Sequence, residues 1–203
     1  NVCGKTPDEY IDVVRRLAEE DVALLEINIS CPNVKAGGIA FGQDPKQVEK
    51  ITAQIKAVAK QPVIMKLSPN VTDITEMAKA AEAGGADAIS LINTLTGMKI
   101  DINRRTFALA NKTGGMSGPA VKPVAVRMVY QAAHAVTIPV LGMGGIRTAE
   151  DALEFIMAGA TMVAVGTANF NEPATTVQVI EGIEQFMQQN GVKDVDELIG
   201  CVK

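Results

Sequence analysis

The sequence predicts an α/β fold with a parallel sheet and, within that class, a (β/α)₈ TIM barrel. Short apolar runs alternate with helical stretches along the chain, and several runs are continuous and β-branched. Such strands are buried on both faces, as in a parallel sheet covered by helices. Polar residues follow each run, whereas a doubly wound sheet would bind its ligand at one switch point after a glycine-rich turn. The barrel is therefore the expected architecture.

Five apolar runs read as strands, and Asn1-Val2 reads as the end of another. A complete barrel has eight strands, typically in about 250 residues. Because the chain has 203 residues and begins with Asn rather than Met, we expect one domain, residues 1–203, that covers the last five βα units of a barrel. The five runs are Ala23–Ile29, Pro62–Leu67, Ala86–Ile92, Ile138–Met143 and Met162–Val165.

Helices are expected between these strands because start and stop signals stand at their ends. Thr6 and Asp44 each precede a proline suited to the first helical position, and Thr148 stands three residues before Asp151. Glycines at the far ends are typical helix stops. The expected helices are Pro7–Glu19, Pro45–Lys60, Ile74–Ala83, Pro119–Val136, Ala149–Ala158, Ala174–Asn190 and a short one near Val195–Val202.

Two connections are longer than a minimal loop of a barrel. Val34–Gln43 is rich in glycine, and Leu95–Ser117 contains two segments, Met98–Ile102 and Thr106–Leu109, that predict a small hairpin. Long loops at the catalytic face of a barrel commonly serve as lids or partner surfaces.

Composition excludes several classes of function. A net charge of −4, 3% aromatic residues and no Trp argue against nucleic acid as a partner. No apolar run approaches the roughly 20 residues that span a bilayer, so we expect no membrane association. The three cysteines are too few and scattered for a disulfide framework or zinc site, which predicts no metal and favours a reduced, cytoplasmic setting.

The segment Asn28-Ile29-Ser30-Cys31-Pro32-Asn33 directly follows a predicted buried strand. Proline blocks its continuation as strand or helix, so two carboxamides and a thiol enter a loop. Carboxamides can donate and accept along the edge of a flat amide-bearing ring, and a thiol with a pKa near ~8.5 is readily tuned to move a proton. The segment suits a substrate cradle with an acid/base, although alone it also fits a turn with an incidental Cys.

Further polar residues follow the next strands. Lys66 stands in the apolar strand Val63–Leu67, and a buried ammonium needs an anionic partner or a shifted pKa. It is either half of a structural ion pair or a cation facing an electron-rich cofactor ring. Asn93 and Thr94 follow the third strand, where they would add an amide and a hydroxyl to the same face or form a polar turn.

The last two strands are each followed by a glycine-containing pair. Gly144-Gly145 and Gly166-Thr167 each follow an apolar strand. Glycines allow backbone amides to approach an anion closely, and a following helix adds its N-terminal dipole. Because the loops after strands seven and eight of a barrel often bind phosphate, these motifs predict a phosphate-bearing cofactor.

With these motifs in the order found here, the chain resembles the dihydroorotate dehydrogenases, FMN-dependent (β/α)₈ barrels of pyrimidine biosynthesis. Cys31, where other members carry Ser, resembles the soluble class, and the segment after it resembles the NAD-linked, two-subunit branch. The matching stretches are Asn28–Lys35, Lys66–Asn70, Ile92–Leu95, Gly114–Pro123, Gly142–Gly145 and Val165–Asn169.

The resemblance implies a role for each matched residue. Cys31 would be the catalytic base that takes a proton from dihydroorotate while FMN accepts a hydride. Asn28, Asn33, Asn93 and Thr94 would hold the substrate. Cys3 departs from the family, which more often has Ala there. FMN would be contacted by Asn1, Asn28, Lys66, Ile92, Gly118, Gly144, Gly145, Gly166 and Thr167, the last four around its phosphate.

The resemblance also implies partners and leaves alternatives. Catalytic subunits would form a homodimer and pass electrons to NAD through an electron-transfer subunit that carries FAD and an iron–sulfur cluster. One alternative is a fumarate-using dihydroorotate dehydrogenase or a related FMN barrel acting on another pyrimidine. Another is a non-catalytic half-barrel, and this chain alone is expected to be inactive.

Overall fold

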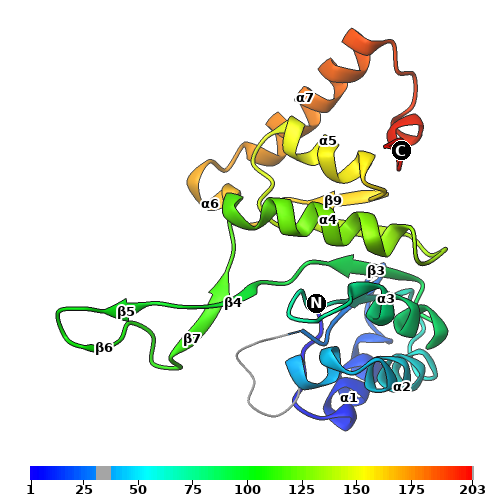
Figure 1. Cartoon of the computed structure of the whole chain (residues 1–203). Coiled ribbons are helices and arrows are strands. Elements are labelled where there is room, and N and C mark those ends of the chain that lie inside the picture. The colour runs from blue at the N-terminus through cyan, green and yellow to red at the C-terminus, as the bar shows by residue number, and fades with distance from the viewer. Residues whose placement is uncertain (31–37, 203) are drawn as a thin grey trace.

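Five parallel strands form the central sheet (Figure 1). Their order across the sheet is the same as their order in the sequence. The computed structural model describes residues 1–30 and 38–202. The strands, in spatial order, are β1 (Leu25–Asn28), β2 (Val63–Lys66), β3 (Ala88–Leu91), β8 (Val140–Met143) and β9 (Met162–Ala164). Val2 adds a parallel bridge to Ile27, beyond β1. All five predicted strands and the additional strand end at Asn1-Val2 are thus confirmed.

Helices α1 (Pro7–Leu17), α2 (Pro45–Lys56), α3 (Ile74–Ala83), α4 (Lys122–Ala133) and α5 (Ala149–Met157) pack on one face of this sheet. The long α7 (Thr175–Asn190) packs on α5, and the short α6 (Ala168–Asn171) follows β9 at the carboxyl end of the strands. The described residues also form short 3₁₀ helices at η1 (Gly38–Gln43), η2 (Pro119–Val121) and η3 (Val195–Leu198). No described helix is long and apolar enough to cross a membrane.

The predicted start signals act as helix caps. The Thr6 hydroxyl accepts a hydrogen bond from the Glu9 amide, and the Asp44 carboxylate accepts one from the Lys46 amide. At α5, Thr148 and Asp151 form the reciprocal capping box that their spacing predicts. Side-chain acceptors thus satisfy amides that each helix leaves without an internal partner.

Two predicted helices differ from the structure. The helix predicted from Pro119 begins as the 3₁₀ turn η2, because Pro123 has no N–H to donate to the Pro119 carbonyl as an α-helix requires. The last predicted helix, near Val195–Val202, is only the 3₁₀ turn η3, which ends at Leu198 before extended backbone at Ile199.

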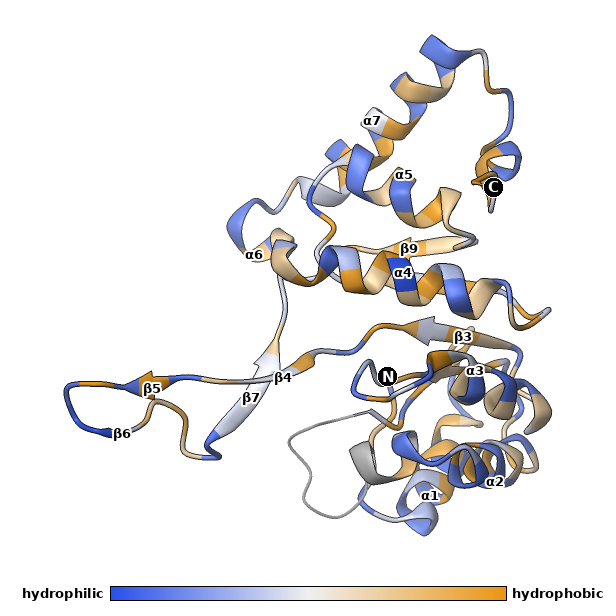
Figure 2. Ribbon diagram, in the orientation of Figure 1, coloured by the Kyte–Doolittle hydropathy of each residue, from blue (hydrophilic) through white to orange (hydrophobic). Residues whose placement is uncertain are grey.

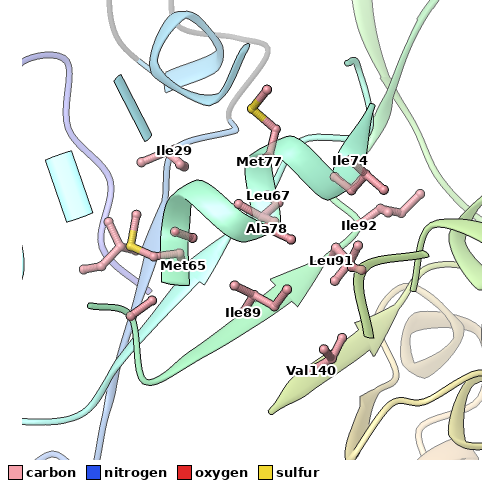
Figure 3. Packing of buried hydrophobic residues seen from close by; sticks show 14 of the residues in the cluster. Ile29, Met65, Leu67, Ile74, Met77, Ala78, Ile89, Leu91, Ile92 and Val140 are labelled. Atoms are coloured by element: carbon pink, nitrogen blue, oxygen red, sulfur yellow. The ribbon is translucent and has the colours of Figure 1, made fainter. Parts of the chain in front are cut away.

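The main hydrophobic core lies between the strands and the helices. In β1, Leu25 and Ile27 are buried against the helices while Glu26, between them, points to the other face, as the alternation of a strand requires. Figure 3 shows the same layer farther along, where Met65 of β2 and Ile89 of β3 belong to one buried cluster with Met77 and Ala78 of α3. Helices α1 to α5 do not cover the opposite face of the sheet, where Glu26 lies.

An arm projects from the sheet between β3 and η2 (Figure 1). Its base is the antiparallel pair β4 (Leu95–Met98) and β7 (Thr113–Met116), and its outer part pairs β5 (Ile100–Asp101) with β6 (Thr106–Phe107). The predicted hairpin is the outer pair. The base was not predicted, since glycines at 114 and 115 give β7 a low strand propensity.

Candidate active site

A cavity of about 810 Å³ lies on the face of the sheet opposite α1 to α5 and reaches the carboxyl ends of the strands. Ligands of parallel α/β folds bind at this end. Residues from all five strands of the sheet or the loops that follow them contribute, together with the segment that joins the arm to η2. The lining residues include Glu26, Lys66, Asn93, Thr94, Ser117, Gly118, Gly144, Gly145, Arg147, Gly166, Thr167 and Asn171.

Most of the predicted site residues that the structure describes meet at this cavity. Asn1 and Asn28 are outside the lining but each contacts a lining residue: Asn1 donates to Glu26, and Asn28 accepts from Asn93. Cys31 and Asn33 lie outside the described residues. The predicted residues that line the cavity are Lys66, Ile92, Asn93, Thr94, Gly118, Gly144, Gly145, Gly166 and Thr167.

One end of the cavity is built from glycine backbone. Gly118, Gly144 and Gly145 have φ values of +93°, +128° and +85°, a region that favours glycine. A Cβ on Gly145 would stand 2.8 Å from the Gly118 carbonyl oxygen, so the loop after β8 packs closely on the start of η2. A Cβ on Gly118 or Gly166 would meet no atom within 4 Å. At these two positions the bare backbone borders open space that an anion can approach.

An ion-pair cluster between α4 and α5 holds the glycine end of the cavity in place. The Lys122 ammonium lies 2.6 Å from carboxylate oxygens of both Asp151 and Glu154, which joins the start of α4 to α5. The Asp151 carboxylate also accepts hydrogen bonds from the amides of Arg147 and Thr148. Because Arg147 directly follows the loop after β8, the cluster holds that loop against two helices.

The cluster perturbs the pKa values of its members. Hydrogen bonds to Asp151 and Glu154 raise the pKa of the Lys122 ammonium above its ordinary value. Burial acts to raise the pKa of Asp151, but hydrogen bonds from Lys122 and from the amides of Arg147 and Thr148 outweigh it, so the pKa is lowered. The folded state therefore stabilises the charged forms of both the Lys122 ammonium and the Asp151 carboxylate.

We expect this cluster to contribute to acid sensitivity. A lowered Asp151 pKa gives stability that is present above the ordinary carboxyl pKa and is lost as pH falls through the folded-state value. Asp151→Asn should lower the free energy of unfolding by about 1–2 kcal/mol at neutral pH, a typical cost for a charge-assisted bond. Below about pH 4 its deficit relative to wild type should shrink.

Urea unfolding from pH 3 to 8 measures this deficit. The control is Asp12→Asn on α1, because Asp12 forms an exposed pair with Arg16, and such pairs contribute about 0–1 kcal/mol. A deficit for Asp151→Asn that is constant across this pH range would contradict the prediction.

A second group of contacts joins the carboxamides at the ends of β1 and β3. The Asn28 side-chain oxygen accepts from the amide and hydroxyl of Ser30 at 3.1 and 2.9 Å, and from Asn93 at 3.2 Å. Asn93 also donates to the Ser30 hydroxyl at 2.6 Å. Tyr10 of α1 donates to the Asn28 carbonyl at 2.6 Å. Two residues 65 positions apart are thus held as one polar cluster.

The base of the arm closes over Thr94. Asn70, after β2, donates to the Thr94 carbonyl and accepts from the Thr96 amide. A Cβ on Gly115 of β7 would collide with the Thr94 side chain, so only a glycine allows this approach. The arm therefore begins at the cavity wall, and its first residues help to place a predicted substrate contact.

Lys66 has the anionic partner that its burial requires. Its ammonium lies 3.6 Å from a Glu26 carboxylate oxygen, and the two side chains are 18% and 19% exposed. Both line the cavity, so Lys66 is at once a member of an ion pair and a cation facing the site. The two interpretations left open by the sequence are compatible.

Several polar residues of this region were not predicted. Glu26 carries the same signal as Lys66, a charge inside an apolar strand. Ser30 is buried between two carboxamides, a role that nothing in its immediate sequence indicates. Arg147 and Asn171 line the cavity from positions after β8 and in α6 that become neighbours only in the folded chain. No three His, Cys, Asp or Glu side chains among residues 1–30 and 38–202 are grouped to hold a metal ion.

Comparison with known proteins identifies the family. A family model described as dihydroorotate dehydrogenase matches residues 1–187. The chain belongs to the dihydroorotate dehydrogenase family. This confirms the resemblance inferred from the sequence motifs.

Related dihydroorotate dehydrogenases match along the whole chain. A protein of Lachnoclostridium phytofermentans is 75% identical over 203 residues, and one of Alkaliphilus metalliredigens is 62% identical over 202. Both are named dihydroorotate dehydrogenase B (NAD(+)), catalytic subunit. The matches cover 100% of this chain but 68% and 67% of those proteins, so the chain spans about two thirds of their length.

A solved structure supports the barrel assignment. The dihydroorotate dehydrogenase of Eimeria tenella, determined in complex with ferulenol, superposes with a TM-score of 0.80 at 23% sequence identity. The superposition covers 96% of this chain and 57% of the other. The parallel sheet with its helices on one face is therefore part of a TIM-barrel fold, as predicted.

Proposed function

We propose that this chain is the catalytic part of an NAD-linked dihydroorotate dehydrogenase, which oxidises dihydroorotate to orotate in pyrimidine (UMP) biosynthesis. The observation that carries the proposal is the convergence of Lys66, Asn93, Thr94 and the glycine loops on one cavity at the carboxyl end of the sheet. The names of relatives up to 75% identical support this substrate and the NAD-linked branch.

We propose FMN as the cofactor. The test of fit is the glycine end of the cavity, where bare backbone at Gly118 and Gly166 borders open space suited to a phosphate. Gly144, Gly145 and Thr167 would complete the phosphate contacts, while Lys66, Ile92, Asn28 and Asn1 would lie toward the ring. When bound, FMN supplies the acceptor for the hydride that leaves the substrate.

The remaining residues handle the substrate. Asn28, Asn33, Asn93 and Thr94 would align the pyrimidine ring through amide and hydroxyl hydrogen bonds, since such groups match its alternating donors and acceptors. Cys31 would take the proton from the ring carbon next to the one that loses hydride. Cys31 directly follows Ser30 in the sequence, and the Ser30–Asn28–Asn93 cluster fixes Ser30 beside the substrate amides.

We further propose the partners implied by the family branch. The relatives are named catalytic subunits, which supports a second, electron-transfer subunit; that subunit would carry FAD and an iron–sulfur cluster. A homodimer of catalytic subunits is supported by the arm, which carries hydrophobic segments at β5 (Figure 2). Ile100, Ile102 and Phe107 of the arm are exposed. A cytoplasmic location rests on the sequence argument from the three scattered cysteines.

Anaerobic mixing of the intact, flavin-loaded protein with dihydroorotate tests the proposal. We expect the yellow flavin absorption to bleach, and NAD in the presence of the electron-transfer subunit to restore it. Recovery with fumarate instead of NAD would indicate the fumarate-using alternative. A protein that binds FMN but does not react with dihydroorotate would refute the proposed substrate, and one that binds no flavin would favour a non-catalytic barrel.

A further inference from the structure

We propose that Glu26 is a positioning residue: its carboxylate holds the Lys66 ammonium at the cavity wall, offsets part of its charge, and so limits how strongly the site favours reduced flavin. This inference rests on the proposed function, since it concerns the same cofactor. Neither the family resemblance nor the sequence motifs assign a role to Glu26.

The strands place these two side chains side by side. Asn28 of β1 is the register partner of Lys66 of β2, and Glu26 lies one strand repeat earlier on the same face. Both side chains line the cavity, and 3.6 Å separates the carboxylate oxygen from the ammonium nitrogen. At this distance the two opposite charges attract each other, and their partial burial reduces the screening by solvent.

The Glu26 carboxylate is itself fixed by hydrogen bonds to both of its oxygens. The Ser90 hydroxyl of β3 donates to one oxygen at 2.7 Å, and the Asn1 side-chain amide donates to the other. Ser90 is fully buried and is the register partner of Lys66, so β1, β2, β3 and the first residues of the chain meet at this carboxylate. A carboxylate anchored in this way cannot readily move away from Lys66.

The Glu26–Lys66 pair supplies most of the charged side chains at the part of the cavity that the structure describes. Among the described lining residues, the charged ones are Glu26, Lys66 and Arg147. Arg147 follows the glycine loop after β8, the predicted phosphate end. The Glu26–Lys66 pair therefore sets the net charge of the opposite, strand-lined part of the cavity, where the flavin ring would lie. A lone ammonium there would stabilise a reduced, electron-rich ring more than a partly neutralised one does.

The test is the midpoint potential of the bound flavin in the intact protein. Glu26→Gln removes the charge but keeps the size and an acceptor for Ser90. We expect it to raise the affinity for reduced relative to oxidised FMN about tenfold, a shift of about 30 mV to more positive potential. Glu26→Asp, which keeps the charge but draws it back from Lys66, should shift the potential part of the way, and serves if Glu26→Gln does not fold.

A double-mutant cycle of Glu26→Gln and Lys66→Met shows whether Glu26 changes the flavin potential through Lys66 or by acting on the flavin itself. The Glu26→Gln shift should be much smaller in a Lys66→Met background. In the cofactor-free protein, Glu26→Gln should lower the urea midpoint by leaving Lys66 unpaired, and the double variant should recover part of this loss, because no unpaired charge remains. The control is Glu49→Gln, the same change at an exposed position of α2, and it should alter neither quantity.

Defined outcomes would overturn the inference. They are an unchanged potential in Glu26→Gln or Glu26→Asp, an equal shift in the Lys66→Met background, or no recovery of stability in the double variant. Wild-type reduction by dihydroorotate reports on the proposed function separately. A wild type that is reduced by dihydroorotate, combined with any of these outcomes, would contradict the role of Glu26 alone.

Discussion

Replacing Cys31 with alanine should slow the reduction of bound flavin by dihydroorotate about 10³-fold while FMN and orotate still bind. A positioned general base typically contributes 10²–10⁴-fold, and alanine removes the base without adding bulk. The Asn28–Ser30–Asn93 cluster just before the thiol keeps its own contacts in the variant, so the substrate amides should stay in place. Stopped-flow reduction under anaerobic conditions measures the rate, and orotate titration of the flavin spectrum measures binding.

The pH dependence and the other cysteines provide the controls. In wild type the reduction rate should rise with pH through the thiol pKa, because only the thiolate accepts the proton. Cys31→Ser should need a higher pH to reach a comparable fraction of its maximum. Cys3→Ala and Cys201→Ala change exposed cysteines and should leave the rate unaltered. Flavin reduction at the wild-type rate in Cys31→Ala would refute the assignment.

Much of the fold was predictable because local and global signals agree. The runs that formed β1, β2 and β3 are mainly apolar, and the caps at Thr6, Asp44 and Thr148 accept the hydrogen bonds that their spacing predicts. Such agreement is typical of sequences that specify one structure. The prediction was less complete where backbone geometry decides, as at Pro123, which delays the start of α4.

The site was predictable where a residue type carries its own chemical signal. The glycines that follow β8 and β9 and the carboxamides at the ends of β1 and β3 could be predicted from the sequence alone. Ser30 could not, because its role is a contact with Asn93, which lies 63 positions away. Neither could the pairing of Glu26 with Lys66, which depends on strand register. The base of the arm was missed since half of β7 is glycine, yet Gly115 is what allows close approach to Thr94.

Gly145→Ala should lower FMN affinity at least tenfold and destabilise the protein by about 1–3 kcal/mol. Gly145 has φ +85°, where an L side chain is strained, and strain of this kind costs about that much. In addition, the new Cβ would lie 2.8 Å from the Gly118 carbonyl oxygen and 3.0 Å from Cβ of Lys122. The loop after β8 must therefore move, and the Gly118 backbone at the cavity must move with it.

Gly191→Ala is the control that introduces similar backbone strain away from the cavity. Gly191 caps the end of α7 with φ +68°, no atom lies within 4 Å of the Cβ it would gain, and it is not among the residues that line the cavity. This variant should lose comparable stability, about 1–2 kcal/mol, and keep its FMN affinity. Urea unfolding of the cofactor-free protein and fluorescence titration with FMN measure the two quantities. If Gly145→Ala and Gly191→Ala bind FMN equally well, the loop after β8 does not contact the phosphate, and the orientation proposed for the cofactor is wrong.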